Sequence, residues 1–232
     1  MTRSSPSVPM HLGVILDGNR RWARVQGLPT LEGHRKGYEN LKTIALAARD
    51  RGVSYLSAYV FSTENWNRSQ EEVAYLMNLL KWVLGHEVAI LHKENIRVRF
   101  LGSRHGLSQT IQAAIDAAED KTKDNVSGTL AFCLNYGGKQ EIADACRRLV
   151  ELGTAPEAIT TEAIEQQLYA PDIPPVDFII RTSGEQRLSN FMLWRAAYSE
   201  LYFVDKHWPA FTADDLDLAL AEYARRTRRF GK

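Results

Sequence analysis

The stretch HLGVILDGNRRWARVQGLPTLEGHRKG, from His11 to Gly37, decides how this chain is interpreted. An apolar run ends at Asp17, and a short run before Asp-Gly-Asn is typical of a buried strand that ends in a turn. The cations that follow are Arg20, Arg21, Arg24, His34, Arg35 and Lys36. Ligands of open parallel sheets bind where strands end. A carboxylate beside arginines there suits a metal-bound phosphate, because the carboxylate holds the cation while the guanidinium groups hold the oxygens.

An ordinary surface explains the same residues. Asp-Gly-Asn is a common turn signal, and successive arginines occur on solvated helix faces. The stretch from His11 to Gly37 therefore leaves both interpretations open, and the rest of the chain must decide between them.

Size and composition fit one globular domain. The chain has 232 residues, of which 44% are hydrophobic and 25% are charged, and this length can bury a substantial core. We expect a single domain over residues 1–232, with residues 1–10 as a flexible N-terminal segment. The net charge of +1 provides no global field for nucleic acid, so no nucleic-acid partner is expected.

The cysteines and the N-terminus predict a cytoplasmic protein. Cys133 and Cys146 lie in apolar or helical patterns without metal-ligand spacing, so we expect them to be reduced and structural. The opening MTRSSPSVPM has no long apolar core. It is therefore predicted to be neither a signal peptide nor a membrane span.

Strand-like apolar runs alternate with amphipathic stretches along the chain. The predicted strands are Leu12–Asp17, Val53–Phe61, Ile96–Leu101, Thr129–Tyr136, Asp177–Arg181 and Glu200–Phe203. The predicted helices are Gly37–Arg51, Glu71–Asn95, Ser108–Lys121, Lys139–Leu152, Thr161–Leu168 and Thr212–Arg228, with Thr212 as an N-cap. This alternation predicts an α/β fold with a central, mostly parallel six-stranded sheet flanked by helices.

The predicted helix Glu71–Asn95 is apolar on more than one face. A helix of that kind is usually buried in the core. It could also form one wall of an apolar tunnel, if the ligand is a hydrocarbon.

Polar side chains are crowded after a second predicted strand, in YVFSTENWNRSQEEV, Tyr59 to Val73. Ser62, Glu64, Asn65, Trp66 and Arg68 lie in a loop at the same predicted sheet edge as Asp17. Ser69 and Glu72 have the spacing of a capping box, which offers a purely structural role for Glu72.

A third candidate segment is FIIRTSGEQRLSNFMLWRAAYSELYF, Phe178 to Phe203. Arg181 ends a strand, and Arg187 and Ser189 follow a glycine turn, an arrangement that could hold a diphosphate bidentately. We expect a helical run over Phe191–Tyr198 that leads to Glu200, a second candidate metal ligand. The C-terminal RRTRRFGK is either a favourable charge at a helix end or a distant phosphate contact.

These segments predict two phosphate sites beside an apolar wall, which suggests the joining of two amphiphilic diphosphates. The chain has no Walker A pattern, no G-x-G-x-x-G and no Ser-His-Asp arrangement. A phosphatase with Asp17 as its nucleophile is an alternative, although it would not explain the apolar wall.

The motifs HLGVILDGNRRWA, EGHRKG, YVFSTENWNRSQEEV, NYGGKQEI and IRTSGEQRLSNFMLWRAAYSELYF together resemble the cis-prenyltransferases, the undecaprenyl diphosphate synthase family. The resemblance runs in order from His11 to about Gly231. It implies a homodimer with a hydrophobic tunnel that condenses isopentenyl diphosphate with an allylic diphosphate, such as farnesyl or geranyl diphosphate. It implies Mg²⁺ as cofactor and a Z-polyprenyl diphosphate product of undecaprenyl length or shorter, with peripheral membrane contact for product release. A non-catalytic partner subunit is the alternative within the family.

The resemblance also implies roles for individual residues. Asp17 resembles the metal-binding catalytic aspartate, Asn65 belongs to the motif that positions the reacting ends, and Glu200 resembles a glutamate associated with metal and dimer contacts. The implied substrate-binding residues are Gly18, Asn19, Arg20, Arg21, Trp22, His34, Phe61, Ser62, Glu64, Trp66, Arg68, Arg181, Arg187 and Ser189. The base that removes the proton stays open among Asn19, Ser62 and a substrate phosphate oxygen.

Three positions depart from the pattern of the family. Thr30 stands where many members carry arginine, so Arg20, Arg24 or Arg35 would have to compensate. Ser69 replaces a common proline. Val60 stands where long-chain members often carry alanine, and its extra methyl groups would obstruct a tunnel, which predicts a product shorter than undecaprenyl.

Overall fold

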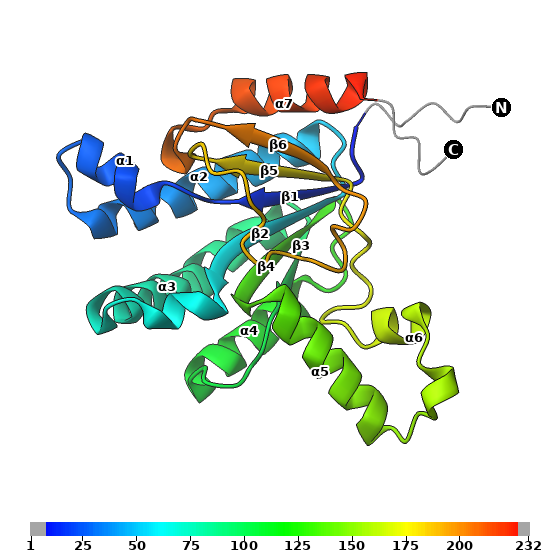
Figure 1. Ribbon diagram of the computed structural model, residues 1–232. Coiled ribbons are helices and arrows are strands. Elements are labelled where there is room, and N and C mark those ends of the chain that lie inside the picture. Colours follow the sequence, from blue (N-terminus) through cyan, green and yellow to red (C-terminus); the bar gives the residue numbers. More distant parts are fainter. Residues whose placement is uncertain (1–7, 227–232) are drawn as a thin grey trace.

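The structure is a computed structural model that describes residues 8–226, in which one sheet lies between layers of helices (Figure 1). The strands are β1 (His11–Ile15), β2 (Tyr55–Ser62), β3 (Ile96–Leu101), β4 (Gly128–Tyr136), β5 (Phe178–Thr182) and β6 (Glu200–Val204). The α-helices are α1 (Asn19–Val25), α2 (Thr30–Asp50), α3 (Gln70–Lys93), α4 (Gln109–Thr122), α5 (Gly138–Glu151), α6 (Thr161–Gln166) and α7 (Ala213–Arg225). Short 3₁₀ turns are η1 (Thr63–Asn67), η2 (Pro156–Ala158) and η3 (Trp208–Ala210).

All neighbouring strands of the sheet are parallel, in the order β3-β4-β2-β1-β5-β6. The predicted fold class is therefore confirmed. Every residue of β1 and of β5 is buried, as expected for strands covered on both faces. β1 and β5 are neighbours, so Asp17 after β1 and Arg181 near the end of β5 reach the same edge of the sheet.

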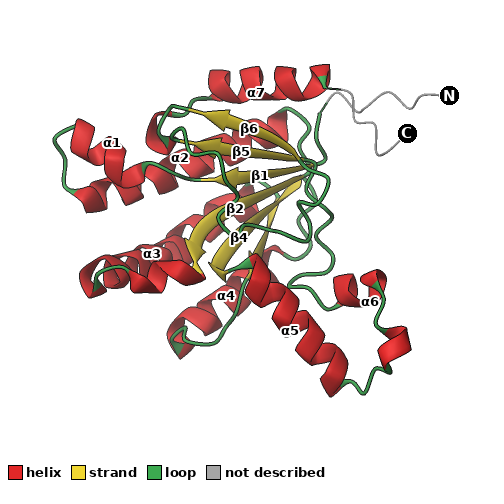
Figure 2. Cartoon of the chain, in the orientation of Figure 1, coloured by secondary structure: helices red, strands yellow, loops and turns green. Residues whose placement is uncertain are grey.

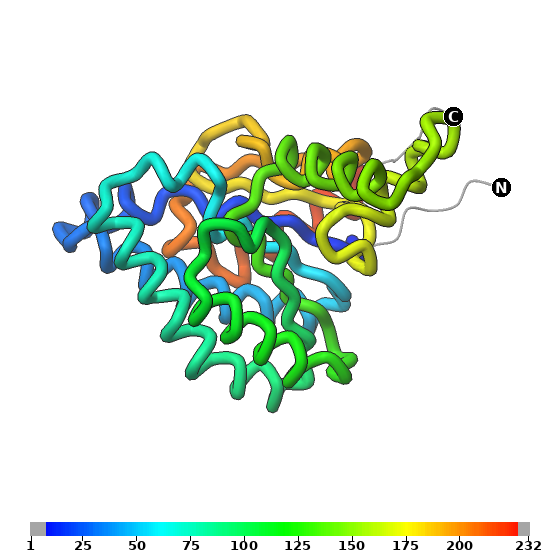
Figure 3. The backbone as a smooth tube through the Cα atoms, turned by 90° about the horizontal axis from the view of Figure 1, so that it is seen from below, coloured from blue at the N-terminus to red at the C-terminus, as the bar shows by residue number. Residues whose placement is uncertain are grey.

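Helices cover the two faces unequally (Figure 2). One face packs against α2, α3, α4 and α7, in a core that includes Leu12, Ile44, Leu91 and Leu220. α3 and α4 run side by side beneath it (Figure 3). The other face packs around Tyr136 and Phe191, and α5 lies on that side (Figure 2).

Helix α1 and the first turns of α2 were not predicted, and in α2 two glycines interrupt the pattern. Gly33 and Gly37 lie inside α2 and weaken its helix propensity. A Cβ at Gly33 would come 2.1 Å from the backbone oxygen of Asn19, and one at Gly37 would come 2.4 Å from its Oδ1. The glycines therefore let α2 approach the start of α1 closely.

Other local predictions have mixed outcomes. Thr212 caps α7 as predicted, and its hydroxyl accepts a hydrogen bond from the Asp215 N–H. The predicted helical run over Phe191–Tyr198 is wrong, because the segment forms bends and turns with Met192 at a φ of 42°. Cys133 is buried, but Cys146 is exposed, so only Cys133 has the expected structural role.

Some predictions fall at or beyond the limits of the described chain. Residues 1–7 and 227–232 lie outside it, and with them most of the N-terminal segment, the end of the last predicted helix and most of RRTRRFGK. Within the N-terminal segment, the carbonyl oxygen of Met10 accepts hydrogen bonds from the N–H groups of Ser54 and Tyr55. No helix within residues 8–226 is long and apolar enough to cross a membrane.

Candidate active site

A cavity of about 500 Å³ opens at the edge of the sheet where the strands end. Two groups of residues line it, one polar or charged and the other apolar. The polar lining residues are Asp17, Asn19, Arg20, Arg21, Arg24, His34, Asn65, Arg68, Glu185 and Arg187. The apolar lining includes Leu41, Val60, Phe61, Leu76, Met77, Leu79, Leu80, Val83, Phe132 and Leu134. One cavity thus combines a charged lining with a hydrocarbon-like one.

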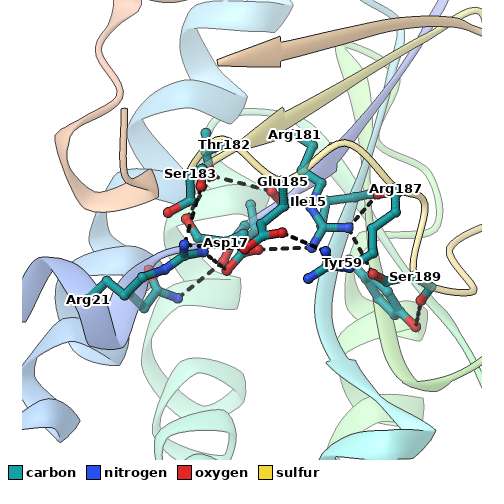
Figure 4. A network of polar contacts seen from close by, with 12 residues as sticks. Ile15, Asp17, Arg21, Tyr59, Arg181, Thr182, Ser183, Glu185, Arg187 and Ser189 are labelled. Carbon is teal, nitrogen blue, oxygen red and sulfur yellow. Dashed lines mark hydrogen bonds and ion pairs between the residues drawn. The ribbon is translucent and has the colours of Figure 1, made fainter. Parts of the chain in front are cut away.

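Asp17 lies between two arginines from different parts of the chain (Figure 4). Arg21 donates to Oδ1 of Asp17 at 3.0 Å, and Arg181 donates to Oδ2 at 2.9 Å. The two cation-rich segments that the sequence presents separately therefore meet at one carboxylate. Burial alone would raise the pKa of Asp17, but the hydrogen bonds from Arg181 and Arg21 outweigh burial and lower that pKa. The carboxylate is ionised at neutral pH.

The turn after Asp17 is held by the loops that follow β5 and β6. The Thr182 hydroxyl and the Trp208 N–H donate to the carbonyl oxygen of Asp17, at 2.7 and 3.0 Å. Gly18 has a φ of 98°, and a Cβ there would lie 2.4 Å from the Ser183 hydroxyl oxygen. Only glycine fits this position without strain.

Glu72 holds together two arginines and one histidine that line the cavity, and burial lowers the pKa of that histidine, His34. Its carboxylate accepts from Arg20 at 3.2 Å and from Arg68 at 2.9 Å, and it lies 3.1 Å from Nε2 of His34. Burial would raise the pKa of Glu72, but Arg68, Arg20 and His34 lower it overall. Ser69 caps α3 as predicted, at 3.3 Å from the Glu72 N–H. The reciprocal half of the capping box is absent, because the Glu72 side chain turns to these three side chains instead.

The donor set fits Mg²⁺. The described chain has no group of three or more His, Cys, Asp or Glu side chains that could hold a metal alone. Mg²⁺ is usually bound by one or two carboxylates together with substrate phosphates. Asp17 supplies one such carboxylate at the cavity, and Glu185 supplies a second, joined to Asp17 through Arg21.

Helix α3 serves both the core and the cavity. Leu76, Met77 and Leu79 line the cavity, whereas Val88 and Leu91 pack in the core. The core interpretation is therefore confirmed for Val88 and Leu91, and the tunnel wall stays a prediction for the residues that line the cavity.

The structure places most predicted site residues at the cavity, but not all of them. Those that line it are Asp17, Gly18, Asn19, Arg20, Arg21, His34, Phe61, Asn65, Arg68 and Arg187. Arg181 and Ser189 join them through Asp17, because Arg181 also donates to the Ser189 hydroxyl at 2.8 Å. Trp22, Ser62, Glu64, Trp66 and Glu200 are not among the lining residues. Trp66 instead donates to the Asn135 side chain at 2.7 Å, in a separate surface groove.

Glu200 is separated from Asp17 by the length of the sheet. It begins β6, whereas the cavity lies where the strands end, and its carboxylate pairs with Arg226 at 3.0 Å. Parallel strands bring like ends together, so Glu200 and Asp17 lie at opposite ends of the sheet, and the metal-ligand role of Glu200 stays a prediction.

Glu185 and Tyr59 line the cavity but were not assigned from sequence, and Arg24 was named only as one of three arginines that could compensate for Thr30. Arg24 lies one helical turn after Arg20 on α1, and Glu185 lies two residues before Arg187. The Tyr59 hydroxyl donates to the carbonyl oxygen of Ser189 at 3.2 Å. Spacing on α1 could have identified Arg24, but the role of Tyr59 depends on a contact between distant loops.

Comparisons with known proteins agree on one family. The Prenyltransf family model, that of undecaprenyl diphosphate synthase, matches residues 15–231. Isoprenyl transferase 2 of Bradyrhizobium diazoefficiens is 48% identical, over 96% of this chain and 90% of that protein. Isoprenyl transferase of Thermotoga maritima is 45% identical, over 97% of each. The crystal structure of lavandulyl diphosphate synthase from Lavandula x intermedia, in complex with dimethylallyl diphosphate, is 36% identical. It has a TM-score of 0.93 and covers 97% of this chain and 99% of that one.

Proposed function

Because this chain belongs to the undecaprenyl diphosphate synthase family of prenyltransferases, we propose that it condenses isopentenyl diphosphate with an allylic diphosphate in its cavity. The product is a prenyl diphosphate with a new cis double bond. The observation that carries the proposal is the union of an arginine-rich lining with an apolar lining in one cavity. Such a cavity can hold the charged head and the hydrocarbon tail of one amphiphilic substrate at once.

The arginines would bind and orient the two diphosphates. Arg20, Arg21 and Arg68 stand on the side of α1 and η1, where they suit the allylic diphosphate. Arg181, near the end of β5, and Arg187, in the loop that follows β5, suit isopentenyl diphosphate. Fixed positive groups stabilise the negative charge that develops on a departing diphosphate, and they need no reorganisation to do so. Bound between Asp17 and diphosphate oxygens, Mg²⁺ would supply further neutralisation of that charge.

Bond formation and proton loss follow from the same placement. The C–O bond of the allylic diphosphate breaks, the double bond of isopentenyl diphosphate attacks the allylic carbon, and the product loses a proton. The Ser62 side chain does not line the cavity, and the Asn19 amide is not basic at neutral pH. A diphosphate oxygen is the acceptor that remains among the three candidates.

The non-catalytic alternative is not favoured. Asp17, Arg181 and Arg187 are all present, and Asp17 and Arg181 are bonded to each other at the cavity. A subunit that only supports a partner would not need an ionised carboxylate held between two arginines.

The same cavity favours a product shorter than undecaprenyl. Val60 lines it, as the tunnel-obstruction hypothesis requires. The volume of about 500 Å³ falls in the range of ~300–1,000 Å³ that takes drug-sized ligands. Val60→Ala should lengthen the product seen by chromatography; an unchanged chain length would refute the role of Val60.

The resemblance to the family also supports a homodimer. The edge strand β6 is only half-buried along its length. A partner subunit at that edge would cover it together with Glu200. Light scattering on the purified chain should give twice the monomer mass, and a monomer at working concentrations would contradict the proposal.

Product analysis tests the proposed reaction. The purified chain is incubated with labelled isopentenyl diphosphate and with dimethylallyl, geranyl or farnesyl diphosphate in turn, with and without Mg²⁺. We expect labelled Z-prenyl diphosphates that need both the starter and Mg²⁺. Release of inorganic phosphate from simple esters, without condensation, would favour a phosphatase.

A further inference from the structure

The loops that follow β2, β4 and β5 meet at one side chain, Asn190. Its Nδ2 donates to Oε1 of Glu64 at 2.9 Å, and Glu64 belongs to η1 after β2. Its Oδ1 accepts from the N–H of Lys139 at 2.8 Å, and its carbonyl oxygen accepts from the N–H of Gly138 at 2.7 Å, both on α5 after β4. Asn190 itself follows β5. One residue thus ties together the loops that follow the neighbouring strands β4 and β2 and the loop that follows β5, which lies beyond β1 in the sheet.

The backbone at this junction is specific. Asn190 has a φ of 67° and Ser189 a φ of 49°, a left-handed conformation that few residues other than glycine adopt and that asparagine tolerates best. A Cβ on Gly137 would lie 2.7 Å from Nδ2 of Asn190 and 2.7 Å from the hydroxyl oxygen of Thr63. Gly137 therefore allows the loops after β2 and β5 to approach each other.

The junction at Asn190 adjoins the residues proposed to bind isopentenyl diphosphate, Arg181 and Arg187. Arg181, which bonds to Asp17, also donates to the Ser189 hydroxyl and to the carbonyl oxygen of Arg187. Figure 4 shows Arg187 and Ser189 beside Arg181, and Asn190 follows Ser189 directly in the chain. On the other side of the junction, η1 carries Asn65 into the cavity.

We propose that Asn190 is a positioning residue that, through Glu64, sets the spacing between the two diphosphate half-sites of the cavity. This inference rests on the proposed function. Asn190 and Glu64 are not among the cavity-lining residues, so the contact acts through Arg181 and Ser189 on one side and through Asn65 on the other. It also gives Glu64 a positioning role in place of the substrate contact that the sequence predicted.

The expected effect is on alignment more than on binding. Carbon–carbon bond formation needs the double bond of isopentenyl diphosphate in line with the allylic carbon, and a misplacement of about 1 Å can cost ~10²-fold in rate. Loosening the junction should leave the allylic site intact. It should lower kcat and raise the KM for isopentenyl diphosphate.

A charge exchange at the junction tests this role. Asn190→Asp keeps the acceptor for Lys139 but places a carboxylate against Glu64, so we expect kcat/KM for isopentenyl diphosphate to fall at least ~10-fold. Glu64→Gln keeps an oxygen for the Asn190 amide and should lose less. In the double variant the amide introduced at position 64 can donate to the carboxylate introduced at position 190, so most of the loss should be recovered.

The controls separate positioning from folding and from binding. The dissociation constant for dimethylallyl diphosphate, measured without the second substrate, should stay within about threefold of the wild-type value in all variants. The midpoints of thermal unfolding should stay within a few degrees of the wild-type value. If Asn190→Asp does not fold, Asn190→Gly keeps the left-handed backbone, lacks the side-chain amide and should show the same loss of kcat/KM.

Two outcomes overturn the inference in distinguishable ways. If the wild-type chain turns over but the double variant is no better than Asn190→Asp, only the positioning role fails. It also fails if each loss of kcat/KM is matched by an equal loss of dimethylallyl diphosphate binding. If the wild-type chain makes no product from any starter, the proposed function and the positioning role fail together.

Discussion

Two carboxylate–arginine pairs in this molecule use similar chemistry in different settings. Glu141 and Arg195 are sealed in the interior, where the carboxylate accepts from Arg195 at 2.6 Å, from the Tyr136 hydroxyl at 2.5 Å and from the Tyr169 N–H at 3.1 Å. Asp17 and Arg181 lie at the cavity, where the carboxylate stays partly exposed and Nε of Arg181 has no hydrogen-bond partner among the described residues. The Glu141–Arg195 pair is fully enclosed by protein groups, whereas the Asp17–Arg181 pair leaves charge available to a ligand.

The difference indicates where stability and function reside. A buried pair whose partners are all satisfied fixes the fold, and the removal of one member leaves the other unpaired. Near the cavity, Arg20, Arg21, Arg24, Arg68, Arg181 and Arg187 outnumber the carboxylates Asp17, Glu72 and Glu185. That excess of positive charge suits a ligand that brings its own negative charge, as two diphosphates do.

The largest expected effect on stability comes from removing the charge of Glu141 in the buried Glu141–Arg195 pair. Glu141→Gln should lower the free energy of unfolding by about 3–5 kcal/mol, because it leaves Arg195 buried without a counter-charge. Denaturant titration measures this loss. Asp120→Asn, which removes an exposed partner of Lys123, serves as the control and should cost less than about 1 kcal/mol. Equal losses in the two variants would contradict the sealed role of Glu141.

The next largest effect is on activity at the open pair. Arg181→Lys keeps the positive charge but loses the planar fork that reaches Asp17 and Ser189 together. We expect kcat/KM for isopentenyl diphosphate to fall ~10²-fold, in steady-state assays. Arg147→Lys on the exposed face of α5 is the matched control. A loss of kcat/KM below threefold would show that activity does not need the planar guanidinium group of Arg181.

A smaller effect concerns the way in which the free energy of unfolding depends on pH, through the buried side chain of His11. Burial lowers the pKa of His11 to about 4. In the unfolded chain the pKa of His11 is about 6.5. The contribution of neutral His11 to the free energy of unfolding is therefore fully present above that pH, and it is lost as the pH falls toward 4. Between pH 7 and 5 we expect a loss of about 2 kcal/mol from His11, at 1.4 kcal/mol per pKa unit.

Unfolding titrations at both pH values measure this loss. The slope with pH should be smaller in His11→Gln than in the wild type, and unchanged in His105→Gln, whose side chain is exposed. A His11→Gln variant with the full wild-type slope would rule out the contribution of His11.

The smallest effect concerns the excess of positive charge near the cavity. Arg24 lines the cavity and forms no ion pair within residues 8–226, whereas Arg35 is paired with Glu32 and Glu39. Arg24→Gln should raise the KM for the allylic substrate about 5–10-fold at low salt and less at high salt. Arg35→Gln should not, because Arg35 is not a lining residue. The reverse order would show that Arg35 compensates for Thr30.

Much of the fold could be predicted because its strands are short runs rich in apolar residues, two of them buried throughout, and because its longest helix has a long apolar pattern. The strand Ile96–Leu101 coincides with β3, and the predicted helix Glu71–Asn95 nearly coincides with α3. Helix α1 and the first turns of α2 were missed, and in α2 Gly33 and Gly37 serve the approach of Asn19 rather than local helix propensity. Close packing between distant residues is not encoded in local spacing.

The site was predicted in parts for a similar reason. Asp17, Arg21 and Arg181 were identified from strand ends, since strand ends of a parallel sheet converge. The cluster around Glu72 and the link from Glu64 to Asn190 depend on contacts between loops. Glu200 was grouped with Asp17 by resemblance, although it lies at the opposite end of its strand.

The most direct test of the central claim is the effect of Asp17→Asn on turnover and on stability in the same preparation. The account predicts that kcat/KM falls at least ~10³-fold, because the amide cannot replace an ionised carboxylate at the diphosphate site. It also predicts that the chain stays folded and loses less free energy of unfolding than the about 3–5 kcal/mol of Glu141→Gln, because Asp17 is partly exposed and the buried Arg181 keeps its hydrogen bonds to Ser189 and to the carbonyl oxygen of Arg187. Near-normal turnover by Asp17→Asn, or unfolding of the chain without this carboxylate, would contradict the account.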